Sequence, residues 1–525
     1  MRTFHKCKNL MLLAFILMSM LLMAGQAVAA EINDDSDLVH LEIYTVNDFH
    51  GALAENGKNP GAAKLVEYLK ETKTLNPNGV LLVSAGDMFQ GSVDSNLLYG
   101  KTVVDVMNYA NFDVMTLGNH EFDWGIDILK QRIDQSNFSY VCANVIDRST
   151  GKSIDFVKPY TLLERDGVKI GVIGIATPET AYKTNPKVVS NYIFEDPAKV
   201  VNALVPEIKQ KGADVIVVLS HLASWMDESG KISGNADTLA LQASSIDAIV
   251  SGHSHQKVNG NLNCIPVVQA YYNGRAVGKI ELFYNKSSRQ VEKSTVSVTT
   301  LPYPGLKNDP RIQDMLDQAQ TEIATVKNSV VGETVSELSH DRNELTETLL
   351  GQWVTDTMRQ AVGADIAFQN TGGLRTGISA GTITMGTLYE VMPFDNTLFT
   401  VDMTGEQVMR VLKYGSMNQK IGMVQYSGIK VSYDAAGPQG IGIVAVTMSD
   451  GTAFSLDKTY KVVTNDFMAA GGDGFDMFQE GQNLHDTNIP VRDILADTIR
   501  RQKVVNFSGD DRWFLKPISE ELQAA

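Results

Sequence analysis

Five short motifs concentrate the side chains of this sequence that could bind a metal ion. Five of the nine histidines lie in them. The motifs are "NDFHG" with Asp48 and His50, "AGDMFQGS" with Asp87, "LGNHEFDWG" with Asn119, His120 and Asp123, "LSHLA" with His221, and "SGHSHQ" with His253 and His255. Imidazole and carboxylate groups together suit Zn, Mn, Fe or Co. The residue types therefore favour a metal site.

The spacing within the motifs indicates how such a site could work. Asp48 and His50 are two residues apart, as are His253 and His255, so on extended backbone each pair points to one side. A carboxylate such as Asp87 can bridge two ions. Two ions about 3.5–4 Å apart form the clamp with which many phosphatases hold phosphate and neutralise charge during in-line displacement. The pattern predicts two-metal phosphoester chemistry.

Each motif directly follows an apolar, β-branched run that is typical of a buried strand. Polar segments of helical period separate these runs, which predicts an α/β fold from Leu41 to about Leu301. The runs cover residues 41–46, 80–85, 113–117, 168–176, 214–220 and 246–251. Ligands of α/β sheets bind outside the carboxyl ends of the strands. We therefore expect the motif side chains to meet at one rim.

Single motifs also have simpler interpretations. "GNHE" could be a turn with a hydrogen-bonded core histidine, "SGHSH" a polar loop, and "LSHLA" alone carries little information. In the second half of the chain, Gly372 and Gly373 could form a plain turn, Arg375 could be a surface charge, and "AAGGDGF" could be a flexible loop. Polar groups at five buried strand ends would be costly without a function, so the joint pattern favours the metal site.

The length of 525 residues indicates several domains. Prolines at 302, 304 and 310 interrupt the pattern, and residues 311–326 then show helical spacing. A second α/β pattern begins at Val331, with helices expected over 349–362 and 404–415 and strands over 428–433 and 459–465. We predict a first domain over 31–305, a linker helix over 306–330 and a second domain over 331–525.

The first 30 residues have the pattern of a secretory signal peptide. Arg2, Lys6 and Lys8 precede an apolar run from Leu10 to Met23, and "AVA" at 27–29 provides a cleavage site. A retained membrane anchor is the alternative, but the run is short for a span. We expect a protein exported to the periplasm or the exterior.

The net charge is −16, and it is −19 without the first 30 residues, which carry three basic and no acidic side chains. So acidic a surface disfavours a nucleic-acid polymer or an anionic membrane as partner. Cys142 and Cys264 remain after loss of Cys7. They could pair or stay free, because sequence does not show proximity.

In this order, the five motifs resemble the metallophosphoesterase domain of 5′-nucleotidases and UDP-sugar hydrolases, and the resemblance covers nearly the whole chain after residue 30. It implies an N-terminal α/β/β/α sandwich and a smaller C-terminal α/β domain. It also implies two divalent ions, one held by Asp48, His50, Asp87 and His255, the other by Asp87, Asn119, His221 and His253. His120 would assist the transition state or the leaving group, oriented by Asp123.

Three further motifs, "QNTGGLRTG", "MPFDNTL" and "NDFMAAGGDGF", resemble the C-terminal domain of that family. The resemblance implies that Asn370 and Arg375 contact the nucleotide, that Phe394 and Phe467 sandwich the base, that Asn396 bonds its edge, and that Asp473 accepts from the ribose. Arg342 is the nearest candidate for a further family arginine, at an offset that does not match cleanly. Rotation of the two domains about a hinge between Leu301 and Val331 is also implied.

The expected activity is hydrolysis of nucleoside 5′-monophosphates. UDP-sugar diphosphatase or 2′,3′-cyclic-nucleotide phosphodiesterase activity is an alternative that the metal motifs do not separate from it. Two alternatives belong to other classes: a non-catalytic surface binding protein and a hydrolase of sulfur esters. The full ligand set argues against the first, and the aromatic and arginine residues of the second domain argue against the second. Metal identity and oligomeric state stay open.

Overall fold

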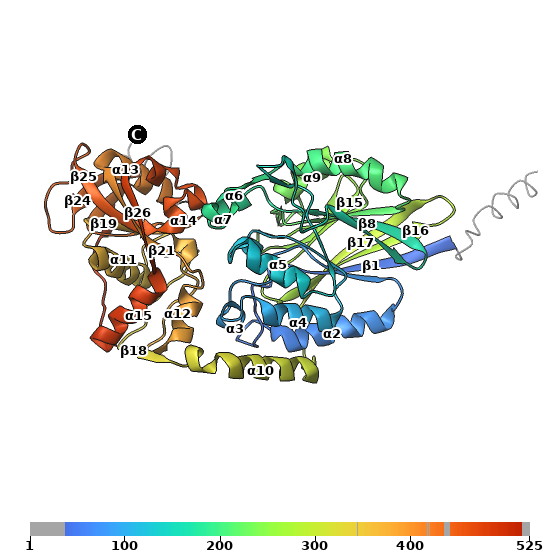
Figure 1. Cartoon of the computed structure of the whole chain (residues 1–525), viewed down its shortest axis with the longest axis horizontal. Coiled ribbons are helices and arrows are strands. Elements are labelled where there is room, and N and C mark those ends of the chain that lie inside the picture. Colours follow the sequence, from blue (N-terminus) through green and yellow to red (C-terminus); the bar gives the residue numbers. More distant parts are fainter. Residues whose placement is uncertain (1–36, 344, 417, 419–420, 435–441, 517–525) are drawn as a thin grey trace, which may run out of the picture.

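The computed structural model describes residues 37–516, apart from 344, 417, 419–420 and 435–441. The expected signal peptide lies outside this part of the chain. Two lobes are visible in Figure 1, one formed by the first part of the chain and the other by the last part. Helix α10 (Pro310–Lys327) runs beneath both. The predicted α/β class is confirmed in both lobes.

Two six-stranded sheets form the first lobe. One has the order β17-β16-β1-β2-β3-β4 and the other β14-β15-β13-β10-β8-β7. The strands of the first sheet are β1 (Leu38–Val46), β2 (Val80–Ser84), β3 (Val114–Thr116), β4 (Ser139–Val141), β16 (Ala276–Asn285) and β17 (Gln290–Thr300). Those of the second are β7 (Tyr160–Arg165), β8 (Val168–Ile175), β10 (Val215–Ser220), β13 (Ala248–Val250), β14 (Lys257–Leu262) and β15 (Ile265–Ala270).

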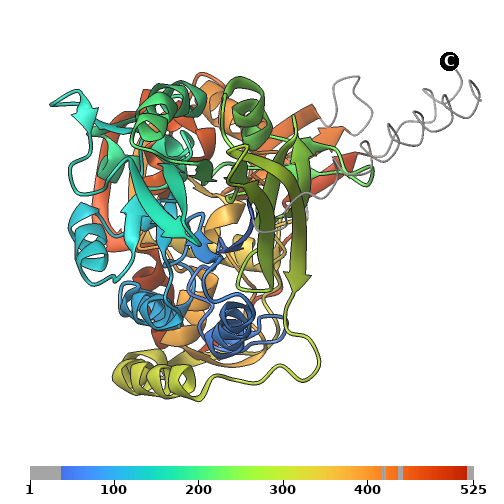
Figure 2. The same cartoon turned by 90° about the vertical axis from the view of Figure 1, so that its right-hand side faces the viewer.

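The sheets pack face to face, and helices cover their outer faces. Ile43 and Val83 of one sheet share a buried cluster with Val172 and Val217 of the other. Figure 2 shows helices on the two outer sides of the strands. They are α2 (Gly61–Leu75), α4 (Lys101–Ala110) and α5 (Ile126–Asp134) on one side, and α8 (Pro197–Gln210) and α9 (Asn235–Gln242) on the other. Strands buried on both faces explain the continuous apolar runs of the sequence.

The central strands of each sheet are parallel. In the first sheet β1, β2, β3 and β4 pair in parallel, and in the second β8, β10, β13 and β15 do so. The rim expected for one sheet is therefore built from two. Motifs after β1, β2 and β3 meet motifs after β10 and β13 where the carboxyl ends of both sheets converge.

The second lobe is built around a five-stranded sheet with the order β22-β19-β25-β21-β26. Its strands are β19 (Ile366–Gln369), β21 (Thr397–Thr404), β22 (Gln425–Ser427), β25 (Thr459–Asn465) and β26 (Gln482–Pro490). Its helices include α11 (Leu349–Val362), α12 (Met385–Val391), α13 (Gly405–Gly415), α14 (Asp466–Ala469) and α15 (Val491–Gln502). Two small sheets complete it, one of β18 (Val330–Thr334), β20 (Gly381–Thr384) and β27 (Val504–Val505), the other of β23 (Ile429–Asp434), β24 (Gly442–Met448) and β28 (Trp513–Lys516).

Two groups of helices contribute to the contact between the lobes. Helix α10 packs on α2 and α4 of the first lobe and on α12 of the second, and its Lys327 pairs with Asp94 of α3 (Val93–Asn96). The short helices α6 (Thr180–Lys183) and α7 (Pro186–Val189) lie beside α14 of the second lobe (Figure 1). These contacts place the rim of the first lobe against the second.

Cys142 and Cys264 are both free, the first buried and the second exposed. Of the two possibilities left open by the sequence, the structure shows unpaired thiols. Among residues 37–516, outside the gaps, no helix has the length and apolar character needed to cross a membrane.

Close contact between β4 and β8 requires a glycine at position 174. A Cβ there would lie 2.0 Å from the carbonyl oxygen of Val141. We predict that Gly174→Ala lowers stability by about 1–3 kcal/mol through overpacking. Gly442→Ala is the matched control, because a Cβ at that strand position meets nothing within 4 Å and φ is ordinary. Thermal unfolding followed by circular dichroism would measure both; equal midpoints for the two variants would contradict the packing.

Candidate metal centre

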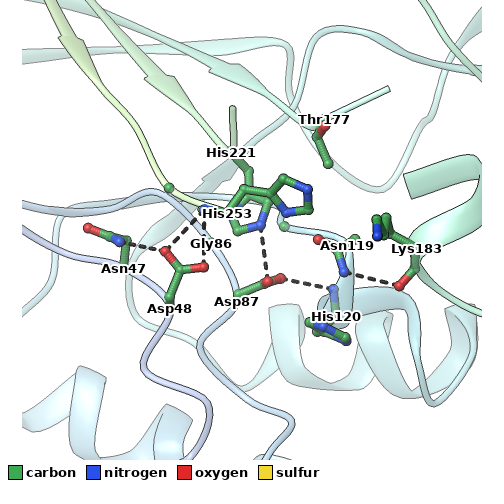
Figure 3. A network of polar contacts seen from close by, with 12 residues as sticks. Asn47, Asp48, Gly86, Asp87, Asn119, His120, Thr177, Lys183, His221 and His253 are labelled. Carbon is green, nitrogen blue, oxygen red and sulfur yellow. Dashed lines mark hydrogen bonds and ion pairs between the residues drawn. The ribbon is translucent and has the colours of Figure 1, made fainter. Parts of the chain in front are cut away.

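Side chains from five strand ends converge at the junction of the two sheets (Figure 3). Their potential ligand atoms form three overlapping trios, each with all atoms within 4.8 Å of one another. The trios are Asp48, His50 and His255; His50, Asp87 and His120; and Asp87, His221 and His253. Asp87 and His50 each belong to two trios. The arrangement has the form of two adjoining cation sites that share a carboxylate.

The backbone at five of these residues adopts the left-handed conformation. Asp48, His50, Asp87, His253 and His255 have φ between 50° and 73°. Outside glycine this conformation costs about 1–3 kcal/mol per residue and clusters at functional sites. Five such residues within one group of side chains indicate that the fold is arranged around the positions of these ligand atoms.

Backbone carbonyls fix the orientation of two imidazoles. Nδ1 of His50 lies 2.8 Å from the carbonyl of Gln90, and Nδ1 of His221 lies 2.7 Å from that of Ala85. Each Nδ1 therefore acts as the donor, which leaves Nε2 as the ring atom that could bind a cation. A carbonyl partner of this kind is the usual outer support of a metal-binding histidine.

Two features at the centre fit side chains that would share a cation. Nε2 of His50 lies 3.0 Å from Nε2 of His255, so two ring nitrogens face each other. Oδ1 of Asn119 and Nε2 of His221 are buried and have no hydrogen-bond partner among the described residues, although His221 Nε2 approaches Asp87 Oδ2 to 3.0 Å. Potential ligand atoms that lie this close together are what two ligands of one ion would show. The donor set fits divalent cations.

The same region buries three carboxyl groups. Asp48, Asp87 and Glu121 are at most 2% exposed. Burial raises the pKa of Asp48 and of Glu121. Burial also acts to raise the pKa of Asp87, but His221 and His120 hold it well below its usual range. Burial lowers the pKa of His50 to about 3, so this ring is neutral and available as a ligand. Cations at this centre would supply counter-charge to the ionised carboxylates.

Glu121 holds two of the ligand-bearing loops together. Its Oε2 accepts the backbone N–H groups of Asp87 at 2.8 Å and Gly118 at 2.7 Å, and its Oε1 accepts that of Met88 at 2.8 Å. Gly118 allows this approach, since a Cβ there would lie 2.2 Å from Asp87 Oδ1. The loops after β2 and β3 are thus joined through one buried carboxylate.

His120 and Asp123 form a dyad beside the trios. Nδ1 of His120 lies 2.7 Å from Asp123 Oδ2, and Thr184 donates to the other Asp123 oxygen at 2.7 Å. Burial alone would lower the pKa of His120, but Asp123 and Asp87 raise it. The backbone N–H of His120 also donates to Asp87 at 2.9 Å. The ring can therefore present a protonated Nε2 to an anionic group.

Residues of the second lobe reach this dyad. The ring of Phe394 stacks on His120 with centroids 5.7 Å apart, and the guanidinium of Arg375 lies 5.6 Å from the Phe394 centroid. Burial lowers the pKa of Arg375 to about 9, and the charge of Arg342 adds to this effect. Two guanidinium groups near the trios provide positive charge for an anion. Arg342, which matched poorly by its offset, lies near enough to Arg375 and His255 for its charge to lower their pKa values.

The other predicted substrate residues form two hydrogen-bonded pairs. Asn370 donates to Asp473 at 2.9 Å, and Asn396 donates to Asp466 at 3.0 Å. Phe467 is half-buried and lies over Gly472. The ring contacts of the described residues do not include one between Phe394 and Phe467, so the base sandwich stays a prediction.

The structure adds residues that the sequence reasoning did not select. Besides Glu121, they are Glu179, whose Oε2 lies 3.1 Å from Nε2 of His253, and Lys183, which contacts Asn119 and Asp473. Glu179 follows β8, just as the five motifs follow their strands. The residues after the apolar run 168–176 could therefore have been identified as a further candidate motif from the sequence.

Fold and site together define a metallophosphoesterase. Residues 41–257 match the family of calcineurin-like phosphoesterases, and residues 322–480 match the 5′-nucleotidase C-terminal domain. The chain therefore carries a calcineurin-like phosphoesterase domain followed by a 5′-nucleotidase C-terminal domain.

Individual relatives agree with both matches. The chain is 32% identical to the endonuclease YhcR of Bacillus subtilis over 82% of its own length and 37% of that protein. It is 27% identical to a 5′-nucleotidase of Vibrio cholerae, over 92% and 94%. A 5′-nucleotidase precursor from Thermus thermophilus, 28% identical, matches with a TM-score of 0.77 over 91% of this chain and 100% of that one. The chain spans little more than a third of the length of two curated relatives that are more than 30% identical to it.

Glu121 provides a test of the loop arrangement. Glu121→Gln replaces one carboxylate oxygen by an NH2 group that faces a backbone N–H, so we expect a loss of about 1–3 kcal/mol of stability. Glu228→Gln, at an exposed position, is the control. Thermal unfolding of both variants would be compared with the wild type. A Glu121→Gln protein as stable as the wild type would show that these three bonds do not hold the loops.

Proposed function

We propose that the chain hydrolyses nucleoside 5′-monophosphates to nucleoside and phosphate at a centre of two divalent cations, Zn or Mn by the character of the donors. The convergence of three ligand trios through Asp87 and His50 carries this proposal. One cation would be held by Asp48, His50, Asp87 and His255, and the other by Asp87, Asn119, His221 and His253. Bound there, the cations supply Lewis acidity toward the phosphoryl group and an activated water.

The protein side chains would orient and stabilise the reacting phosphate. His120, held in one tautomer by Asp123, would donate from Nε2 to a phosphoryl oxygen or to the leaving 5′ oxygen. Its raised pKa favours the protonated ring that such a donor requires. The guanidinium groups of Arg375 and Arg342 would balance the charge of the anion.

The second lobe would select a nucleoside. Phe394 and Phe467 would stack on the two faces of the base, Asn396 would bond its edge, Asn370 would contact the nucleotide, and Asp473 would accept hydrogen bonds from the ribose hydroxyls. Support comes from the stacking of Phe394 on His120, which places an aromatic face beside the reacting group. Base stacking fixes a nucleoside without selecting strongly among bases.

The organisation of the chain belongs to the same proposal. We assign residues 31–305 to the catalytic domain, 306–330 to the linker helix and 331–525 to the substrate-binding domain. A signal peptide over residues 1–30 would deliver the enzyme to the periplasm or the exterior, where it would act on free nucleotides.

Metal removal tests the reaction. Phosphate release from AMP should fall to background after dialysis against EDTA, because the ligand set would lose its cations, and should return on addition of Zn or Mn. Assays with UDP-glucose and 2′,3′-cyclic AMP in parallel would show which phosphorus bond is preferred. Full activity after verified metal removal would contradict the two-cation centre; faster turnover of UDP-glucose or cyclic AMP would move the assignment to those substrates.

Phe467 tests nucleoside recognition. Phe467→Ala should lower kcat/KM for AMP roughly tenfold to hundredfold, since base stacking contributes about 1–3 kcal/mol, while p-nitrophenyl phosphate, which lacks a nucleoside, should be hydrolysed at the wild-type rate. Phe514→Ala, at an aromatic residue 41% exposed in the same lobe, is the matched control. An equal loss on both substrates would count against a stacking role.

A further inference from the structure

Lys183 contacts both lobes of the candidate site. Its Nζ lies 2.7 Å from Oδ1 of Asp473, in an ion pair whose two side chains are 25% and 11% exposed. Its backbone carbonyl accepts a hydrogen bond from Nδ2 of Asn119 at 3.2 Å (Figure 3). One residue thus joins the carboxylate proposed to read the ribose to an amide proposed to hold a metal.

The carbonyl of Lys183 determines which atom of Asn119 faces the centre. An amide offers one donor nitrogen and one acceptor oxygen, and only the oxygen can bind a cation. With Nδ2 held by Lys183, Oδ1 is directed away from it, and that oxygen is buried without a hydrogen-bond partner among the described residues. A shift of the Lys183 backbone would therefore displace a ligand atom.

The segment around Lys183 contacts the site at further points. Glu179 lies 3.1 Å from Nε2 of His253, and Thr184 donates to Asp123 at 2.7 Å. Glu179 occupies the N-terminal cap position of α6, yet its side chain accepts no capping hydrogen bond there. Towards the second lobe, Asn185 donates at 2.7 Å to Asp466, the partner of Asn396. Residues 179–185 therefore contact proposed catalytic groups on one side and proposed nucleotide-reading groups on the other.

We propose that Lys183 is a positioning residue that couples nucleoside binding at Asp473 to metal binding at Asn119. The inference rests on the proposed function. Oδ1 of Asp473 accepts a hydrogen bond from Lys183, and Oδ2 accepts one from Asn370. Each oxygen retains a lone pair that could accept a ribose hydroxyl. A bound nucleoside would order this carboxylate and, through the ion pair, the segment that orients Asn119. Metal and nucleoside then strengthen each other's binding by the same factor.

Calorimetric titration of Mn into chelator-treated protein tests the coupling without any turnover. With saturating adenosine, the weaker of the two bound ions should bind about fivefold more tightly in the wild type, within the usual range of such couplings. Lys183→Met should bring this ratio close to one, and Lys183→Arg, which keeps the charge, should retain most of it. Circular dichroism would establish that each variant is folded.

Lys187→Met is the matched control. Lys187 lies four residues further along the chain, in α7, and pairs at 2.8 Å with Asp486 of the second lobe, but its side chain is 53% exposed. Among the described residues its Nζ contacts Asp486 and the ring of Phe399, neither of which is a proposed site residue. The variant should keep the wild-type ratio. A ratio near one in the wild type, or an equal ratio in wild type and Lys183→Met, would overturn the coupling. Binding of fewer than two ions by the wild type, or no binding of adenosine, would overturn the proposed function instead.

Discussion

Three carboxyl groups and the imidazole rings of the candidate metal centre are enclosed together at the junction of the two sheets. Asp48, Asp87 and Glu121 are almost fully enclosed, and beside them two imidazole nitrogens face each other at 3.0 Å. Burial of a charged carboxylate is costly without a paired charge. Cations at this position would supply such a charge and would bind the ring nitrogens. The rest of the lobe can be understood as the framework that holds these groups in place against that cost.

The framework has three layers. Parallel strands of two packed sheets bring the chain to one rim, and their apolar side chains form the buried layer between them. Sharp turns with left-handed backbone then direct Asp48, His50 and Asp87 inward rather than along the strands. Finally, backbone carbonyls and the Glu121 carboxylate fix the rotation of the rings and the distance between the loops. Without any one of these layers, the other two would no longer hold the ligand atoms together.

Much of this could be predicted from the sequence because it depends on local pattern. Apolar runs located the strands, and the helix expected over 349–362 is α11 with the same bounds. Polar residues directly after strands identified the trio members. What pattern does not encode is the pairing of distant segments. Three features depend on contacts between segments that are more than thirty to nearly three hundred residues apart in the sequence. They are the division of the strands between two sheets, the bonds of Glu121 to two loops, and the contacts of Lys183 with Asn119 and Asp473. Arg342 shows the same limit, since its offset in the sequence concealed its proximity to Arg375.

The most direct test of the account is crystallographic. Crystals of the protein grown with Mn should show two peaks in an anomalous difference map, about 3.5–4 Å apart, with a carboxylate oxygen of Asp87 between them and Oδ1 of Asn119 turned toward one peak. A single peak, or two peaks that do not share Asp87, would contradict the claim that this rim is built to hold a pair of cations.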